Sequence, residues 1–279
     1  MNPASQDQET ADKFASSWLN VYAAGVYSEE QFLEWIAPWT LGEIADQSVL
    51  ELGCGSGALL VHTLKGKPAR LVGVDLGDSV RRARELLAGT AAVIEKADLT
   101  DHTDLLRRFG TFDRVYCIGV LHHLKEPRRG FESLLLLTRP GGRFHGWVYA
   151  REGNALVRFT VEPLRRLAHR LPWWVNKYAL ALPLAVPFFL YSQLCRALTR
   201  APGAEQLLPM FRYMLWISRR EFRFHHHVAF DQLVSPQTAF IPRATVEQWL
   251  ADPRIESGSS YVILRNGNGW KFGGRIRAL

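Results

Sequence analysis

The sequence has only three cysteines among its 279 residues: Cys54, Cys117 and Cys195. They are far apart and match no metal-ligand spacing, which argues against a disulfide framework and fits a reducing compartment. The N-terminus is polar and lacks the apolar core of a signal peptide. Residues 178–191 form a charge-free stretch of fourteen residues with two prolines, which we expect to be too short to span a bilayer. We therefore predict a cytoplasmic protein.

Acidic residues are scarce in one segment of the chain. Residues 151–224 hold twelve Lys and Arg but only four Asp and Glu, a surplus of +8, whereas the rest of the chain balances at −1. The net charge of +7 therefore comes from this segment alone. With 47% apolar and 22% charged residues, the chain otherwise has the composition of an ordinary soluble protein with a sizeable core.

Strand and helix patterns alternate through the first half of the chain. Apolar runs predict strands over 48–52, 70–74, 92–96, 112–118 and 143–149, with helices between them. This alternation is typical of an α/β fold with a doubly wound, mostly parallel sheet and helices on both faces. Near the C-terminus, Asn266-Gly267-Asn268-Gly269 separates two further strand patterns and predicts an antiparallel hairpin.

The same patterns divide the chain into four parts. We predict an N-terminal helical cap over 1–45 and a ligand-binding core over 46–150. A basic and apolar helical insertion occupies 151–240, where the alternation stops. Residues 241–279 are predicted to supply a last helix and the hairpin that completes the core sheet.

Residues 49–57, VLELGCGSG, run from a predicted strand into three glycines. Gly53, Gly55 and Ala58 fit the spacing of a dinucleotide-binding loop, and Asp75 follows at a suitable distance. No Gly-Lys-Ser/Thr follows, which excludes a phosphate P-loop. Glu51 precedes the glycines at the end of the strand, where it would repel a pyrophosphate. The loop therefore suits a cationic ligand better than a dinucleotide.

Two more acids follow strands at the same predicted edge of the sheet. Asp75 ends the second strand, where a carboxylate can accept hydrogen bonds from both hydroxyls of a ribose. Asp98 follows the third strand and can accept from the exocyclic amine of a base. With Glu51 they describe a pocket for a cationic nucleoside without phosphate, which S-adenosylmethionine fits. Each acid alone can also be a helix cap or a solvated charge.

The order and wording of these motifs resemble the class I S-adenosylmethionine-dependent methyltransferases, a large Rossmann-like family. VLELGCGSG is similar to the family's first motif and LVGVDL to its second, and three later segments continue the series: ADLTD (97–101), FDRVYCIGVLHHL (112–124) and RPGGRF (139–144). The resemblance implies a Rossmann-like sheet with an antiparallel final strand, and S-adenosyl-L-methionine as cofactor.

The resemblance also implies which residues hold the cofactor. It places Glu51 and the backbone of the glycine loop at the methionine end, Asp75 at the ribose and Asp98 at the adenine, with two leucines packed against the base. The full set of implied cofactor residues is Glu51, Gly53, Cys54, Gly55, Gly57, Asp75, Leu76, Asp98 and Leu99. Cys54 is interpreted as a small packing residue.

Candidate catalytic residues follow the fourth and fifth strands. His122 or His123 can act as a general base near neutral pH, or the pair can pack the loop and shield the cofactor. The acceptor side is predicted to involve Tyr149, Arg151, Glu152 and Asn154, with Tyr149 or Glu152 as an alternative base; an ordinary polar loop is the other interpretation. Trp18 and Tyr22 either close over the cofactor or belong to a packing stripe.

The basic insertion leaves three interpretations open. It is a helical lid that shapes an acceptor pocket, a membrane-surface element with aromatic anchors and a basic face for anionic lipid, or a nucleic-acid surface. Nucleic acid is disfavoured because the segment is so apolar. His225-His226-His227 predicts no metal site, because adjacent side chains point apart.

These observations predict an S-adenosylmethionine-dependent methyltransferase that acts on a small-molecule or lipid-like acceptor by in-line methyl transfer. Peripheral contact with an anionic membrane is a further hypothesis. The alternatives are an RNA methyltransferase, a non-catalytic protein of the same fold whose insertion binds a membrane or a partner, and a nicotinamide oxidoreductase. Glu51 and the terminal hairpin disfavour the last of these. The acceptor atom is not readable from the sequence.

Overall fold

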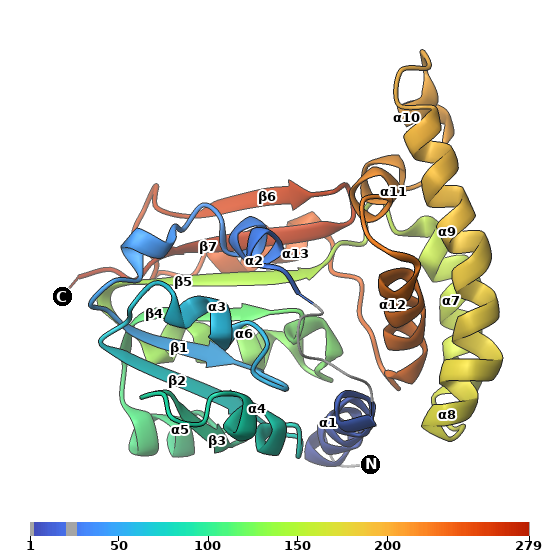
Figure 1. Cartoon of the computed structure of the whole chain (residues 1–279). Helices are drawn as coiled ribbons and strands as arrows, with labels where there is room; N and C mark the ends of the chain where they lie inside the picture. Colours follow the sequence, from blue (N-terminus) through green and yellow to red (C-terminus); the bar gives the residue numbers. More distant parts are fainter. Residues whose placement is uncertain (1–2, 21–26, 279) are drawn as a thin grey trace.

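The computed structural model describes residues 3–20 and 27–278, with the side chains of 6–16 and 27–278. One seven-stranded sheet has the order β3-β2-β1-β4-β5-β7-β6. Its strands are β1 (Ser48–Leu52), β2 (Arg70–Asp75), β3 (Val93–Lys96), β4 (Phe112–Ile118), β5 (Thr138–Tyr149), β6 (Tyr261–Arg265) and β7 (Gly269–Arg275). The first five pair in parallel, and β7 pairs antiparallel with both β5 and β6 (Figure 1). The predicted fold class is confirmed, including the antiparallel hairpin.

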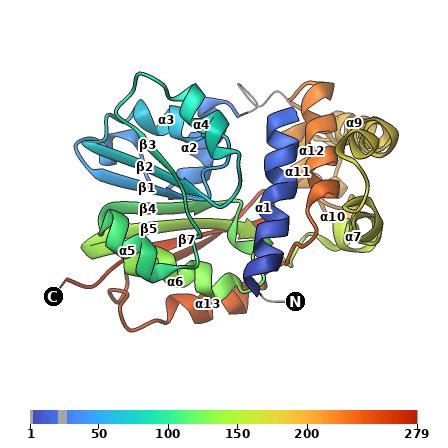
Figure 2. The same cartoon turned by 90° about the horizontal axis from the view of Figure 1, so that it is seen from below.

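Helices cover both faces of the sheet (Figure 2). One face carries α2 (Glu29–Ile36), α3 (Leu60–Leu64) and α4 (Val80–Leu86), and the 3-10 turn η1 (Leu41–Glu43) lies nearby. The other carries α5 (His102–Phe109), α6 (Pro127–Leu137) and α13 (Arg243–Leu250). Each face has its own apolar core, because strand side chains alternate between the faces. Helix α1 (Pro3–Asn20) and the turn η2 (Leu121–His123) lie near the carboxyl ends of the parallel strands.

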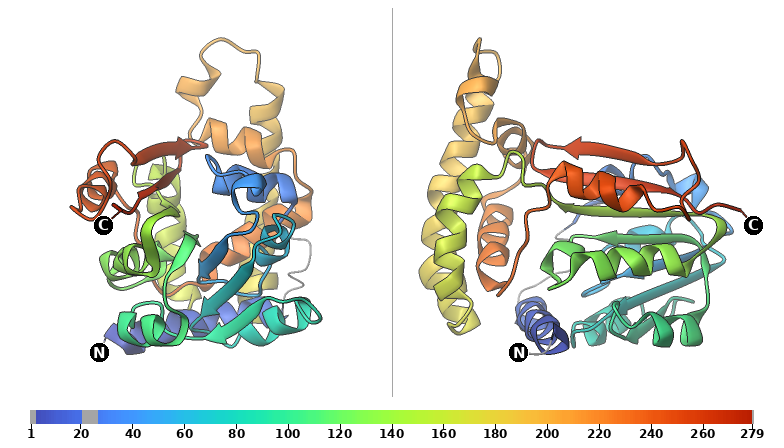
Figure 3. Two further views of the ribbon diagram at one scale, coloured as in Figure 1. Left: turned by 90° about the vertical axis from the view of Figure 1, so that its left-hand side faces the viewer. Right: turned by 180° about the vertical axis from the view of Figure 1, so that it is seen from behind.

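The insertion is a separate helical layer at that end of the sheet. It contains α7 (Ala155–Ala168), α8 (Trp173–Val175), the π-helix η3 (Asn176–Ala181), α9 (Leu182–Ala197), α10 (Ala204–Leu207), α11 (Phe211–Ile217) and α12 (Phe222–Val234). Helix α12 lies nearest the sheet, and α7 and α9 pack on its outer side (Figures 1 and 3). The insertion has two small cores of its own.

The apolar stretch of the insertion is longer than the sequence suggested. Trp173–Ala197 is a continuous run of 25 helical residues, and it is the one helix in the described part of the chain that is long and apolar enough to cross a membrane by length and composition. The expectation of a short, interrupted segment was therefore wrong. Pro183 falls in the first turn of α9, where a missing N–H costs little. Just before it, Leu182 N donates to Lys177 O in the wide π-helical pattern.

Candidate functional site

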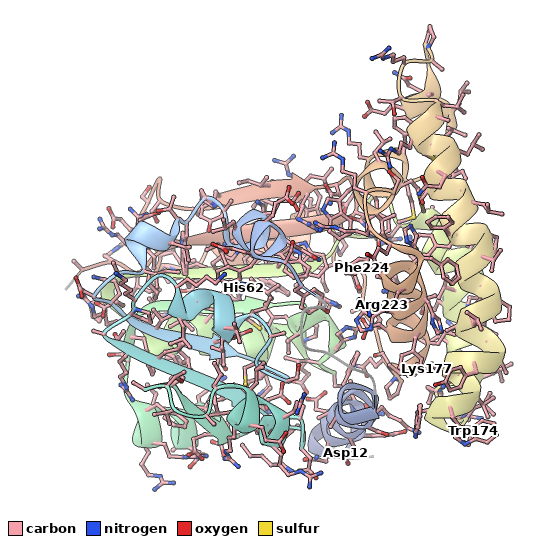
Figure 4. All side chains as sticks on the ribbon, in the orientation of Figure 1. Asp12, His62, Trp174, Lys177, Arg223 and Phe224 are labelled. Carbon is pink, nitrogen blue, oxygen red and sulfur yellow. The ribbon has the colours of Figure 1, made fainter. Side chains whose placement is uncertain are left out.

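A cavity lies between the carboxyl ends of β1, β2 and β4 on one side and helices α1 and α12 on the other. Its walls include the glycine loop after β1, side chains from the 3-10 turn after β4, and residues of the C-terminal hairpin. Phe224, which Figure 4 labels on α12, is one of the residues that the insertion contributes. The cavity thus joins the core to the insertion.

The glycine loop exposes backbone to this cavity. Gly53 and Gly55 have φ angles of +78° and +51°, a region that favours glycine. A Cβ on Gly53 would come within 2.4 Å of the Val120 side chain, whereas a Cβ on Gly55 would meet nothing within 4 Å. Gly55 therefore leaves its backbone open to a ligand. Cys54 lines the cavity as a buried thiol, and Gly57 faces α4 instead, with Ala83 as its neighbour.

Glu51 is buried at the end of β1 and lines the cavity. Its Oε2 accepts a hydrogen bond of 2.9 Å from the Tyr116 hydroxyl, which also contacts Thr63 Oγ1 at 2.7 Å. Burial raises the pKa of Glu51 to about 8. The carboxyl group is therefore mostly protonated at neutral pH, and an adjacent ligand cation would favour its ionised form.

Asp75 holds the loop together and still faces the cavity. One carboxylate oxygen accepts from Gly55 N at 2.9 Å, and the other accepts from Gly77 N at 2.8 Å and Ser79 Oγ at 3.3 Å. Burial raises its pKa despite these bonds. A carboxylate offers about four acceptor sites, so at least one remains for a ligand hydroxyl.

Asp98 and two leucines form the next part of the wall. One Asp98 oxygen, Oδ1, accepts from Thr100 N at 2.7 Å and Thr100 Oγ1 at 2.8 Å, which leaves the other oxygen available. Leu76 and Leu99 line the cavity beside the acids. Three carboxyl groups, an open glycine backbone and an apolar surface for a base therefore share one wall. This donor set fits a cationic nucleoside such as S-adenosylmethionine, and it offers nothing basic for a pyrophosphate.

Replacing Asp75 tests the ribose assignment. We expect Asp75→Ala to weaken S-adenosylmethionine binding by roughly 10- to 100-fold, because hydrogen bonds to a charged group contribute about 1.5–3 kcal/mol each. Asp78→Ala, an exposed carboxylate three residues later that pairs with Lys96, is the matched control and should bind normally. Isothermal titration measures both. Equal affinity of the two variants would exclude Asp75 as a ligand residue.

The two histidines after β4 have different environments. His122 is fully buried behind the cavity wall, and its Nδ1 accepts from Tyr149 N at 3.4 Å. Burial lowers its pKa well below the usual value, so it stays neutral. His123 lines the cavity, and its Nδ1 lies 3.0 Å from Gln237 O. Because a carbonyl only accepts, Nδ1 carries the proton and Nε2 keeps a lone pair.

Tyr149 also lines the cavity. Its hydroxyl accepts a hydrogen bond of 2.7 Å from Gln232 Nε2, and Gln232 is held in turn by the buried Arg165. Burial raises the pKa of Tyr149 above its usual value. The phenol is therefore suited to donate a hydrogen bond and poorly suited to act as a base.

The three residues after Tyr149 that were predicted to line an acceptor pocket do not reach the cavity. Arg151 and Glu152 are exposed, and Glu152 accepts from Arg243 N at the start of α13 and from Trp270 Nε1 on β7. Asn154 is buried, and its Nδ2 donates to Ala150 O and to a hairpin carbonyl. The chain turns away from the cavity after β5, because Ala150 bridges to Ile241. The structure corrects that expectation and gives Glu152 and Asn154 scaffold contacts.

Other elements supply the residues on this side of the cavity. They include Trp35, Tyr213, Trp216, His227, Asp231 and Arg265. Residues 230–240 were expected to lead back into the main domain with their polar groups near the acceptor, and Asp231 of this segment lines the cavity. In the structure the three histidines diverge: His225 contacts Ser192 Oγ and His226 contacts Lys177 O, while His227 faces the cavity. Sequence spacing alone does not show that Asp231 comes near Tyr149, because the long insertion separates the two residues.

The N-terminal helix contributes to the opposite wall through Asp7, Thr10, Ala11 and Phe14. The Phe14 ring lies 4.9 Å from the His123 ring. Trp18 and Tyr22, which were predicted to close over the cofactor or to pack, lie outside the residues whose side chains are described. Helix α1 nevertheless covers the cofactor side of the cavity (Figure 2).

Comparison with known proteins also indicates a methyltransferase. Residues 50–144 match a family model described as a methyltransferase domain. The chain is 30% identical over 119 residues to a ubiquinone biosynthesis O-methyltransferase of Albidiferax ferrireducens, covering 42% of this chain and 44% of that protein. It is 31% identical over 94 residues to a tRNA U34 carboxymethyltransferase of Campylobacter jejuni subsp. doylei, covering 34% and 32%. The chain thus spans less than half the length of these relatives.

A solved structure with a similar fold is magnesium protoporphyrin IX methyltransferase from Synechocystis PCC 6803, which has bound S-adenosylhomocysteine. It shares 13% sequence identity and a TM-score of 0.53 over 99% of both chains. The matched family model covers the glycine loop, Asp75, Asp98 and both histidines after β4. The chain therefore contains, over residues 50–144, a methyltransferase domain.

Proposed function

We propose that this protein transfers a methyl group from S-adenosylmethionine to a small or lipid-like acceptor that loses a proton in the reaction, as a hydroxyl does. The observation that carries the proposal is one continuous cavity. It joins the acids and glycine backbone of the domain to Asp231, an acid that the insertion supplies. When bound, S-adenosylmethionine supplies a methyl group on a sulfonium, which is open to in-line attack.

The acceptor half of the cavity is aromatic with a fixed cation. Arg265 is buried; its guanidinium lies 5.4 Å from the Trp35 ring centre and 4.9 Å from that of Trp216. Glu34 anchors both Arg265 and Trp216 through Oε2, at 2.8 Å and 2.9 Å. Within the described residues, Arg265 Nε and Trp35 Nε1 have no hydrogen-bond partner. Aromatic rings around a fixed guanidinium suit a planar acceptor with oxygen substituents.

Asp231 is suited to take the acceptor's proton. Burial raises its pKa to about 6, and Arg165 opposes the rise. Its carboxylate forms no hydrogen bond or ion pair with any residue that the structure describes. A base with a pKa near 6 is ionised at neutral pH and still accepts a proton readily. His123 Nε2 is the alternative base, but burial lowers its pKa to about 4, which makes it weaker.

The relatives support a small acceptor and oxygen as the acceptor atom. The ubiquinone biosynthesis enzyme is by its name an O-methyltransferase. The tRNA-modifying relative keeps RNA methylation as the second candidate, and the surplus of basic residues in the insertion favours it. RNA binding would give a steep dependence on salt, because basic side chains would displace counterions from phosphates.

Product formation tests the proposal directly. The purified chain is incubated with S-adenosylmethionine labelled in the methyl group and with phenolic and quinol compounds, a bacterial lipid extract or total tRNA. We expect label to enter an organic-soluble product from the first or second pool. Label in tRNA alone would establish the second candidate. No transfer to any pool, with the cofactor bound, would contradict methyl transfer and leave a non-catalytic protein of this fold.

A further inference from the structure

Exposed apolar side chains are concentrated on the insertion. Within the described part of the chain, twelve of the sixteen exposed large apolar residues lie between 156 and 207. They are Leu156, Phe159, Leu167, Leu171, Trp174, Tyr178, Leu182, Leu184, Val186, Leu190, Leu194 and Leu207. Scattered exposed apolar residues are normal, but a concentration of this kind marks an interaction surface.

On the long helix these residues form a regular stripe. Trp174, Tyr178, Leu182, Val186, Leu190 and Leu194 are spaced four residues apart, so successive members are neighbours in a stripe that stays exposed as it winds along the helix. Tyr178 and Trp174 are 55% and 57% exposed, and Figure 4 places Trp174 at the α8 end of the long helix. The opposite side is buried against the protein through small and polar residues: Asn176, Ala181, Ala185, Ser192 and Cys195. The helix thus presents its large apolar side chains to the outside and its small and polar side chains to the protein.

Helix α7 repeats the arrangement. Leu156, Phe159, Leu167 and the following Leu171 are exposed, and Phe159 is 75% exposed. Helices α7 and α9 both pack on the outer side of α12, on the side of the insertion away from the sheet (Figures 1 and 2). We call the outward sides of α7 and of Trp173–Ala197 the outer face.

Basic residues surround the outer face. Arg166 and Arg170 near the end of α7 are exposed, and Arg196 and Arg200 are exposed at the other end of the long helix. Trp173–Ala197 contains no acidic residue, and α7 contains only Glu162. A surface that combines aliphatic side chains, interfacial aromatic residues and positive charge fits the interface of an anionic bilayer. Like charges would oppose a second copy of this chain on the same face.

The long helix is also tied into the fold, which argues against insertion across a membrane. Asn176 Nδ2 donates to Ala168 O at 2.8 Å, His226 contacts Lys177 O at 2.7 Å, and Ser192 contacts His225. Crossing a bilayer would break these contacts and expose polar groups to lipid tails. A helix that lies in the interface plane keeps them.

We propose that the outer face docks the protein on the surface of an anionic lipid bilayer. The inference goes beyond methyl transfer, since it concerns where the protein binds and not which reaction it performs. Helix α12 connects the two regions: α7 and α9 pack on its outer side, and Phe224, His227, Val228 and Asp231 line the cavity. Docking therefore brings the acceptor half of the cavity close to the membrane.

Vesicle sedimentation of the full chain tests the docking. Vesicles of phosphatidylcholine with 30% phosphatidylglycerol should bind the protein, and vesicles of phosphatidylcholine alone should bind it far more weakly. We expect Trp174→Ser/Leu182→Ser/Leu190→Ser to lose binding at least tenfold. Arg166→Gln/Arg170→Gln should weaken it about fivefold for each charge removed. The matched controls are Val93→Ser/Leu264→Ser and Arg81→Gln/Arg277→Gln, which change exposed residues elsewhere.

Each other outcome contradicts membrane docking. Equal binding of the outer-face variants and their controls would exclude this face. No vesicle binding, with a dimer in sedimentation velocity that the Trp174 variant abolishes, would assign the face to a second copy. Binding to tRNA that the Arg166 variant removes, without vesicle binding, would assign it to nucleic acid. The melting shift with S-adenosylmethionine confirms that every variant is folded and keeps the cofactor site.

Discussion

Asp231→Asn is expected to lower kcat by about 10²- to 10⁴-fold, the usual contribution of a general base. Asparagine keeps the shape of the side chain but cannot accept the proton. In the unmodified protein, activity should rise with pH around an apparent pKa of about 6, because only the ionised carboxylate is active and burial sets that value. The variant should lose this rise while it keeps its affinity for S-adenosylmethionine.

A pH profile of kcat/KM for these variants decides which residue is the base. Glu221→Gln, an exposed acid that precedes the same helix, is the control and should behave as the unmodified protein. His123→Gln should lower turnover less than Asp231→Asn. If His123→Gln abolishes the pH dependence and Asp231→Asn preserves it, His123 is the base and Asp231 is not.

Glu51→Gln should remove the pH dependence of cofactor binding. Before binding, burial holds the pKa of Glu51 at about 8, so the group is protonated at pH 6–7. The ammonium of S-adenosylmethionine stabilises the ionised form, so binding releases a proton and affinity rises with pH until the pKa is passed. Below pH 8 the affinity for S-adenosylmethionine should rise by up to tenfold per pH unit, over the range in which Glu51 stays ionised in the complex.

The size of the effect follows from a buried charge pair. At pH 8.5 we expect Glu51→Gln to bind S-adenosylmethionine roughly 30-fold or more weakly, since losing one partner of such a pair costs about 2–5 kcal/mol. At pH 6 the two proteins should be similar, because glutamine resembles the protonated acid. Titrations in two buffers of different ionisation enthalpy measure the proton release. 5′-Methylthioadenosine lacks the amino-acid part and serves as the control. Its affinity should not depend on pH in this range. If its affinity does depend on pH, the titrating group is not Glu51.

The cofactor side of the cavity was predictable because the fold fixes it. Parallel strands end at one edge of the sheet, so Glu51, Asp75 and Asp98, each at or just after the end of a strand, had to come together. The glycine pattern predicted the loop, and Asn266-Gly267 predicted the hairpin. Asp75 has a second task that the sequence did not reveal, since it accepts from Gly55 N and Gly77 N and so shapes the loop itself.

The acceptor side was not predictable, because it depends on how distant helices pack. Asp231 and Arg265 reach the cavity from α12 and from β6, more than eighty residues beyond the fifth strand. Arg151 and Glu152 follow β5 directly, but the bridge from Ala150 to Ile241 turns the chain away. The two prolines misled in the same way: Pro183 falls in the first turn of α9 beside a π-helical turn, and Pro187 lies inside that helix without ending it.

Thermal unfolding with S-adenosylmethionine, S-adenosylhomocysteine and NADH in parallel tests the central claim most directly. A ligand at a hundred times its Kd stabilises the folded state by about 2.7 kcal/mol. For a chain of this size that corresponds to a rise in Tm of roughly 5–10 °C. We expect this rise with the two adenosyl ligands and none with NADH. A rise with NADH alone would contradict the account, because it would show that the cavity accepts a pyrophosphate beside Glu51.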